Sequence, residues 1–372
     1  MKSLRILQVL PSLEMGGVEE NTIQDAIIFK ENGIVPFIAS SGGKMKKRLD
    51  DQCIQHFYMP LKWKNPVMVL LNALWFIVII WLKQIDIIHA RSRAPAWSAW
   101  FACKLTTCKF ITTFHGYYSG FDNPIKKHYN KIMTYGEHVI VSNDFMKNHI
   151  EQHYNCPSEK IVVMSRGVDV EKFQNVEQSR IEATYENYGC RNIILLPGRI
   201  TDWKGQHIFL EAFREFQKVN DEYLGILMGK GKEGSCYFQR VKTYIKDHNL
   251  NVVIEEECND VPALFKASQC VVLPTLKYET FGRCGIEALA ANKPIIATQY
   301  NISLPIGTFM EYHPFSTKHL ENCMRKLILN LGENKNFDAE KKIIKEYSLE
   351  KYQENLLSFI NIYNGNWTRT SL

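Results

Sequence analysis

The sequence predicts an α/β protein made of two doubly wound domains, in each of which helices cover both faces of a parallel sheet. Its 372 residues suffice for about two domains of ordinary size. Short apolar runs rich in Ile and Val alternate with longer helical patterns, as expected for parallel strands buried on both faces. A polar stretch at 166–192 separates two series of such runs, and we expect the linker near residues 170–185.

The predicted strands follow one another in these two series. The first comprises residues 5–10, 35–40, 85–90, 110–115, 138–142 and 160–165, and the second comprises residues 192–198, 223–229, 251–256, 270–275 and 293–298. Helical patterns lie between them, as at 205–219, where Ile208, Ala212 and Phe216 share one stripe. The predicted domains are residues 1–172 and 173–347. A final amphipathic helix at 348–365 is expected to pack back on the first domain.

One apolar run raises the question of a membrane. Residues 67–82 contain a single strongly polar residue, Asn72, but a spanning helix needs about twenty apolar residues. We therefore favour a buried helix between two strands. The alternative is a helix that partly enters the membrane interface, for which Trp75, Trp81 and the upstream lysines would be suited. A true membrane span is the least favoured interpretation.

The excess positive charge lies in the first half of the chain. Residues 1–172 hold 21 Lys and Arg against 15 Asp and Glu, whereas residues 173–372 hold 24 of each. This charge either forms a solvated face or attracts an anionic surface, such as phospholipid headgroups or a phosphorylated acceptor. No nucleic-acid-binding motif accompanies it, so we expect no nucleic-acid partner. The basic clusters are Lys44, Lys46, Lys47 and Arg48, followed by Lys62 and Lys64.

The cysteines and the first residues predict a cytoplasmic protein. Ten cysteines without a CxxC pair fit reduced thiols better than a zinc module or a disulfide framework. The apolar run within residues 1–12 is too short for the core of a secretory signal.

Two glycines follow the first predicted strand. Gly16 and Gly17 either form an ordinary tight turn or open a helix whose N–H groups could meet an anion. The sequence is not GxGxxG, and Glu19 and Glu20 follow directly, which weighs against a dinucleotide site.

Charged residues follow two strands of the second series. Arg199 and Lys204 come after strand 192–198, where two cations could clamp a diphosphate. Glu279 and Glu287 come after strand 270–275 and are separated by seven residues. A helix beginning near Gly282 would direct the amides of its first residues, Arg283, Cys284 and Gly285, at a phosphate. Glu279 could accept hydrogen bonds from sugar hydroxyls, and Glu287 from a ribose.

His115 ends a strand of the first series and is followed by Gly116, which would let a ligand approach the backbone. Its alternative role is that of a structural histidine. The other histidines form no HExxH or HxH pair, so we expect no metal site.

Taken together, six ordered motifs resemble the retaining GT-B glycosyltransferases of family 4, in particular those that build lipopolysaccharide and other envelope glycans. The motifs are GGVEE (16–20), TTFHG (112–116), RGVDVEKF (166–173), GRITDWKG (198–205), GKGKEG (229–234) and E-x7-E (279–287). The resemblance covers nearly the whole chain. It implies two Rossmann-like domains facing each other across a cleft, and hinge closure when the donor binds.

The resemblance also implies roles for single residues. Arg199 and Lys204 would hold the donor diphosphate, Glu287 the ribose and Glu279 the sugar hydroxyls. His115 would lie beside the transferred sugar. Gly16 and Gly17 would make room for the donor phosphate and the acceptor, and Phe281, Gly282 and Arg283 would line the sugar–diphosphate end.

The implied reaction moves a hexosyl- or pentosyl-type sugar from a UDP- or GDP-linked donor to a hydroxyl of a glycolipid or oligosaccharide acceptor, with retention of configuration. It requires no cofactor and no metal, because the cations and the helix dipole neutralise the charge. The protein would be cytoplasmic, with peripheral contact with the cytoplasmic face of the inner membrane as a further expectation.

The sequence departs from the family pattern at several points. Arg166 stands where most relatives have Asn, Glu257 and Cys258 follow a strand that usually ends in Gly, and Ala291 and Asn292 replace a small residue and Gly. Three other functions stay open. They are a sugar-nucleotide epimerase or phosphorylase on the same plan, a nucleotide-binding oxidoreductase, and an inactive membrane-docked scaffold.

Overall fold

The computed structural model of the chain describes residues 3–14, 16–118, 123–189, 192–302, 304, 308–329 and 345–364. They form two compact units, unit 1 from residues 1–166 and 352–372, and unit 2 from residues 167–351. The sequence analysis placed the first boundary after residue 172 rather than 166, and the second after residue 347 rather than 351. Residue 365 of the predicted final helix lies outside the described ranges.

Unit 1 contains a seven-stranded parallel sheet among its described residues, in the order β3-β2-β1-β4-β5-β6-β7. The six strands of the first predicted series are present, and β3 is an addition. Gln55 and Tyr58 at the two ends of β3 are exposed, so this edge strand lacks the apolar run by which the others were recognised. The strands are β1 Arg5–Val9, β2 Val35–Ser40, β3 Gln55–Tyr58, β4 Ile87–Ala90, β5 Lys109–Thr113, β6 Val139–Val141 and β7 Ile161–Val163.

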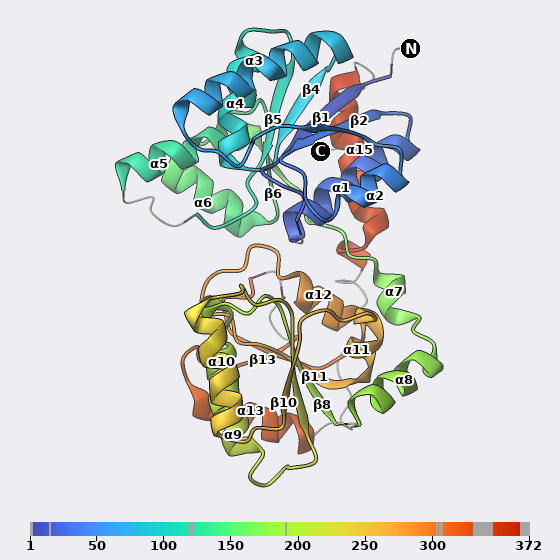
Figure 1. Cartoon of the computed structure of the whole chain (residues 1–372), viewed down its shortest axis with the longest axis vertical. Coiled ribbons are helices and arrows are strands. Elements are labelled where there is room, and N and C mark those ends of the chain that lie inside the picture. Colours follow the sequence, from blue (N-terminus) through green and yellow to red (C-terminus); the bar gives the residue numbers. More distant parts are fainter. Residues whose placement is uncertain are drawn as a thin grey trace. The chain divides into compact units, whose positions relative to one another are not determined.

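Helices cover both faces of this sheet, because alternate strand residues point to opposite sides. Leu7 and Val9 of β1 belong to a core shared with α3 and α4, whereas Ile38 of β2 packs with Ile23 of α1. Figure 1 shows α3 and α4 on one side of the sheet and α1 and α2 on the other. The helices are α1 Gly17–Glu31, α2 Lys46–Asp51, α3 Pro66–Lys83, α4 Arg93–Lys104, α5 Pro124–Lys131, α6 Asp144–Tyr154 and α15 Leu349–Asn361.

Helix α15 belongs to unit 1 from Tyr352 onward. The Tyr352 hydroxyl donates a 2.7 Å hydrogen bond to Oδ1 of Asp25 in α1. Farther along, His138 Nδ1 and Tyr363 Oη lie 2.6 Å apart. Side chains of α15 and of the turn that follows it therefore reach residues of unit 1 that come far earlier in the chain.

Helix α3 corrects the expectation of a buried helix. It does connect two strands, but only 28% of it is buried, because one stripe packs on the sheet and α4 while the rest faces outward. Its length and hydropathy would also suffice to cross a membrane. The exposed large apolar residues on and just before α3 are Trp63, Val67, Leu70, Leu71, Leu74, Trp75, Val78, Trp81 and Leu82. We call this surface the α3 face.

Unit 2 contains a six-stranded parallel sheet among its described residues, in the order β10-β9-β8-β11-β12-β13. All five strands of the second predicted series are present. The two-residue β13 is too short to produce an apolar run. The strands are β8 Ile193–Pro197, β9 Leu224–Met228, β10 Val252–Glu255, β11 Ser268–Leu273, β12 Ile295–Ala297 and β13 Met310–Glu311.

The predicted linker is folded rather than extended. Two helices, α7 and α8, lie within residues 170–188, and Arg180 of α8 donates two 2.7 Å hydrogen bonds to Asp260 at the start of α11. The helices of unit 2 are α7 Val170–Gln174, α8 Gln178–Tyr188, α9 Gln206–Phe216, α10 Cys236–Asp247, α11 Val261–Ala267, α12 Arg283–Ala290 and α13 Thr317–Leu329.

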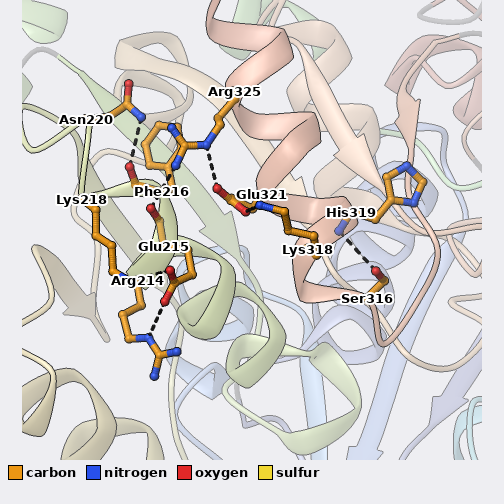
Figure 2. Close-up of polar contacts among 10 residues, drawn as sticks. All are labelled: Arg214, Glu215, Phe216, Lys218, Asn220, Ser316, Lys318, His319, Glu321 and Arg325. Carbon is orange, nitrogen blue, oxygen red and sulfur yellow. Dashed lines mark hydrogen bonds and ion pairs between the residues drawn. The ribbon is translucent and has the colours of Figure 1, made fainter.

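A charged contact joins α13 to α9 on one face of this sheet. Glu321 is buried and pairs with Lys318 and Arg325 at 2.7 Å each. Arg325 also donates a 3.0 Å hydrogen bond to the Glu215 carbonyl oxygen. Figure 2 shows this network, which supplies the buried carboxylate with the partners that it needs.

Candidate functional site

The loops after β8 and β11 meet through a lysine and a glutamate. Lys204 Nζ lies 2.6 Å from Glu279 Oε1, and the two side chains are 8% and 20% exposed. Gly205 makes this approach possible because its φ is +74° and a β-carbon there would collide with the Pro274 carbonyl oxygen. The motif that contains Lys204 and the motif that begins with Glu279 are therefore adjacent in space.

The helix after Glu279 begins as expected. Gly282 has a φ of +61° and precedes α12, in which Arg283 Nε donates a 2.7 Å hydrogen bond to Glu287 Oε1. The expectation of three available amides needs correction. The Gly285 N–H already donates a 2.8 Å hydrogen bond to the Gly282 carbonyl oxygen, so it is engaged within the first turn.

A cysteine lies among these charges. Burial, followed by the Glu287 and Glu279 carboxylates, raises the pKa of the Cys284 thiol to about 12, while the cations of Lys204 and Arg283 act in the opposite direction. All four charged side chains thus act on one buried atom. We call Lys204, Glu279, Arg283 and Glu287 the charged cluster.

Two other predicted residues lie differently. Arg199 follows β8, is exposed, and makes no ion pair within the described part of the chain. Gln206 holds its loop by donating a 3.0 Å hydrogen bond to the Arg199 carbonyl oxygen. Phe281 is only 5% exposed and packs in the core with residues of α7, α11 and α12. Its ring is thus largely covered by the core, and its role at the sugar–diphosphate end stays a prediction.

In unit 1, Arg166 connects the predicted residues. Its guanidinium contacts His115 Nδ1, and Nη1 lies 3.7 Å from where a β-carbon of Gly17 would be. Gly16 caps α1 and Gly17 is the first residue of that helix. The departure noted at Arg166 is thus a cation placed beside both sequence-predicted parts of unit 1.

The environment of His115 keeps its ring neutral. Burial, then the charges of Arg166 and Arg91, hold the pKa of His115 well below its ordinary value. At neutral pH this imidazole carries no charge and can both donate and accept one hydrogen bond.

Sequence reasoning missed a buried polar network beside His115. Arg91 follows β4, forms an ion pair with Asp25, and donates a 3.1 Å hydrogen bond from Nε to Gln8 Oε1. A cavity of about 10 Å³, room for about one water molecule, lies between this pair, His115 and Arg166. The signal was the position of Arg91 directly after a strand, which is also how Arg199 was found.

The described residues contain no group of three or more His, Cys, Asp or Glu side chains arranged to hold a metal ion.

Comparison with protein families matches two models to this chain. The model described as Glycosyltransferase Family 4 matches residues 15–172, and the model described as Glycosyl transferases group 1 matches residues 177–305. The chain spans about half the length of the curated relatives that it matches.

Three solved structures are similar over almost the whole chain. A glycosyltransferase from Rickettsia africae is 32% identical, with a TM-score of 0.87, over 99% of this chain and 100% of that one. HepE from Anabaena, solved with UDP and glucose, is 17% identical with a TM-score of 0.82 over 96% and 99%. WaaG, a glycosyltransferase involved in lipopolysaccharide biosynthesis, is 14% identical with a TM-score of 0.73 over 97% and 100%. The last two likenesses concern the fold alone.

Proposed function

Because this chain belongs to the family 4 glycosyltransferases, which have the GT-B fold, we propose that it transfers a sugar from a nucleotide diphosphate sugar to a hydroxyl of an envelope glycan or glycolipid. The anomeric configuration is retained and no metal ion takes part. The observation that carries this proposal is the charged cluster, in which cations and carboxylates gather at the start of α12.

The cations are suited to the donor diphosphate. Arg199 offers an exposed guanidinium with a planar pair of donors, and Lys204 offers a buried ammonium held in place by Glu279. The amides of Arg283 and Cys284 at the first turn of α12 add partial positive charge. Together they would stabilise the charge that develops on the leaving phosphate.

The carboxylates are suited to hydroxyl groups. Glu279 would accept hydrogen bonds from the transferred sugar, and Glu287 from the ribose of the nucleotide. A leaving phosphate oxygen would take the proton of the acceptor hydroxyl, so no separate general base is needed. WaaG and HepE support this direction, since the former is involved in lipopolysaccharide biosynthesis and the latter binds UDP and glucose.

In unit 1, the neutral His115 ring would hydrogen-bond the transferred sugar. Arg166 would contribute positive charge next to Gly17 and His115, where a phosphate of the donor or of the acceptor could approach.

Transfer is tested with a panel of UDP- and GDP-sugars and lipid-linked or oligosaccharide acceptors, in buffer that contains a chelator. We expect one donor to be consumed with formation of a product whose anomeric configuration, measured by NMR, equals that of the donor. Lys204→Ala should abolish most turnover, whereas Lys218→Ala, which removes an exposed lysine of the same unit, should leave it unchanged. Loss of all turnover on chelation contradicts the metal-free reaction.

The same assay separates the alternatives. A donor that is consumed without any acceptor would indicate an epimerase or, with inorganic phosphate, a phosphorylase. Inversion of configuration would contradict the proposed stereochemistry and leave sugar transfer intact.

We further propose that the protein is cytoplasmic and attaches peripherally to an anionic membrane through the α3 face. Trp75 and Trp81 are 61% and 73% exposed, and such rings are suited to the membrane interface. Lys62 and Lys64 precede the helix and Lys83 ends it, so positive charge lies near both ends of the apolar surface, although Lys62 Nζ lies 3.8 Å from Glu14 Oε1. Two of the three basic residues of α2 are less available, since Lys46 pairs with Asp50 and Arg48 with Glu20.

Membrane attachment is tested by co-sedimentation with vesicles of phosphatidylglycerol and phosphatidylcholine. We expect binding to the anionic vesicles, loss of it in the variant Trp75→Ser with Trp81→Ser, and no loss in Val219→Ser, which removes an exposed apolar residue of unit 2. Equal binding of the double variant, or self-association of the protein through α3 in place of vesicle binding, contradicts the proposal.

A further inference from the structure

A second pocket lies in unit 2, apart from the charged cluster. It has a volume of about 520 Å³, within the usual range for small-molecule sites. Its walls come from α9, from α10, from the loops after β8 and β11, and from the turn before α13. Figure 1 shows α9 and α10 next to each other at this side of unit 2. None of the four residues of the charged cluster lines it.

The lining combines aromatic rings with balanced charge. The rings of Trp203, Tyr237, Tyr244 and Phe315 provide much of its apolar wall. Two carboxylates, of Asp202 and Glu211, are matched by the cations of Arg240 and Lys277. Burial lowers the pKa of His207, the remaining titratable base in the wall, so it is mostly neutral at pH 7. Such a wall does not attract a polyanion such as a diphosphate.

The hydroxyl groups of Tyr237 and Tyr244 in the pocket wall differ in their hydrogen bonding. Tyr237 Oη accepts a 3.2 Å hydrogen bond from the His207 N–H and donates one of 3.2 Å to Gln206 Oε1. Tyr244 Oη is buried and has no hydrogen-bond partner among the described residues. A buried hydroxyl without a partner is unfavourable, so a ligand hydroxyl there would be favoured.

Phe315 carries a second sign of a binding role. Its φ is +68°, a conformation that a bulky residue rarely adopts, within a turn closed by a 3.1 Å hydrogen bond from the Ser316 N–H to the His313 carbonyl oxygen. The strain supports no core packing, because the ring is 61% exposed. Backbone strain that packing does not require is typical of ligand clamps.

We propose that this pocket binds a neutral saccharide. A sugar ring has apolar C–H faces, which stack on aromatic rings, and an edge of hydroxyls, which suits carboxylates and the Tyr244 hydroxyl. The absence of net charge in the wall favours a sugar over a nucleotide. The proposal rests on the pocket alone and does not depend on the proposed donor site.

The pocket is nevertheless adjacent to that site in the chain. The Trp203 ring lies 4.8 Å from Lys204 Nζ, and the Trp203 carbonyl oxygen accepts a 2.8 Å hydrogen bond from the N–H of Leu276, another wall residue. A saccharide stacked on the Trp203 ring would therefore contact the residue that directly precedes Lys204, next to the Lys204–Glu279 pair.

The experiment is ¹⁹F NMR of the full chain labelled with 5-fluorotryptophan, in which Trp203→Phe identifies the Trp203 resonance. The probes are the methyl glycosides of glucose, galactose, mannose and N-acetylglucosamine, together with maltotriose, chitobiose and, as a stacking compound that is not a sugar, free uracil. We expect a saturable shift of the Trp203 resonance with at least one saccharide and none with uracil.

Two variants sharpen the test. Phe315→Gly should weaken saccharide binding at least tenfold while the melting temperature stays constant or rises, because Gly tolerates the turn conformation. Asn249→Gly, a matched change at another residue of unit 2 with positive φ, should leave binding unchanged. Tyr244→Phe should weaken binding about threefold to tenfold.

Saturation by uracil alone, no shift with any saccharide, or unchanged binding in both pocket variants overturns the proposal. A failure of this kind, with sugar transfer intact, leaves the proposed function standing. Saccharide binding without any sugar transfer supports this pocket as a saccharide site and contradicts the proposed function.

Discussion

The two units place charge at the loops that follow their strands, but they do so in different ways. In unit 1, Arg91 and Asp25 pair with side chains only 2% and 1% exposed. In unit 2, Arg283 and Glu287 pair with 36% and 10% exposed. A fully buried pair is costly to separate and fixes the structure around it, whereas a partly exposed pair can exchange partners with a ligand. The same fold thus provides a fully buried pair in unit 1 and, in unit 2, a partly exposed pair beside the less exposed Lys204 and Glu279.

The largest effect is expected at the buried pair of unit 1. Arg91→Met should lower the free energy of unfolding by about 3–5 kcal/mol, because it leaves the Asp25 carboxylate buried without its cation. Hydrogen-exchange mass spectrometry should assign the loss to unit 1. The double variant Arg91→Met with Asp25→Asn should recover part of it, and Arg283→Met should cost about 1 kcal/mol or less. Equal losses in the two units would remove the contrast drawn above.

The next largest effect is expected in the charged cluster of unit 2. Glu279→Ala should reduce turnover by about a hundredfold, or about 2.7 kcal/mol of transition-state stabilisation, and should also destabilise unit 2, because the buried Lys204 loses its carboxylate partner. Steady-state kinetics with the identified donor measure this change. Glu215→Ala, which removes a carboxylate from the exposed surface of α9, serves as the control. Unchanged kinetics in Glu279→Ala would refute the site assignment.

The pH dependence of stability should be strongest in unit 1, although His207 of unit 2 also has a lowered pKa. The folded pKa values of His89 and His115 lie well below their ordinary value, chiefly because of burial. Between the folded value and about 6.5 the unfolded chain binds more protons, so stability is complete above pH 6.5 and falls as pH decreases. Each histidine contributes a slope of up to about 1.4 kcal/mol per pH unit.

Urea titrations between pH 5 and 8 test this prediction. His115→Gln should reduce the slope and leave the remainder to His89 and other histidines. A slope identical to that of the parent protein would mean that the His115 ring is not desolvated in the folded state.

The smallest effect is expected at the start of α12. Gly282→Ala should destabilise unit 2 by about 1 kcal/mol, because Gly282 has a φ of +61°. Chemical denaturation measures the loss. The change should also weaken donor binding if the first turn shifts. A gain in stability would show that this backbone conformation is not strained for Ala.

The apolar runs predicted eleven strands because buried parallel strands leave a local signature. The exceptions were β3, with exposed polar ends, and the two-residue β13. Exposure along α3 was not predictable, since an apolar helix can face either a core or the outside, and the sequence does not say which elements cover it.

The charged cluster could be foreseen from residue types placed after strands. Contacts between segments that are far apart in the sequence could not be predicted in this way. Arg91 pairs with Asp25 in α1, and Asp25 in turn accepts a hydrogen bond from Tyr352 of α15. These residues are far apart in the sequence, so no local residue spacing indicates this buried polar network. The inward turn of Phe281 and the engaged amide of Gly285 depend on the packing and bonding of single atoms.

The hydrogen bond from Tyr352 to Asp25 has a consequence for biosynthesis. The chain leaves unit 1 after residue 166 and returns to it at residue 352. During translation, the amino-terminal half therefore emerges from the ribosome without its closing helix, and must wait until all of unit 2 has been synthesised before Asp25 acquires that partner. A nascent chain stalled before residue 352 would consequently hold a complete second lobe and an unfinished first one.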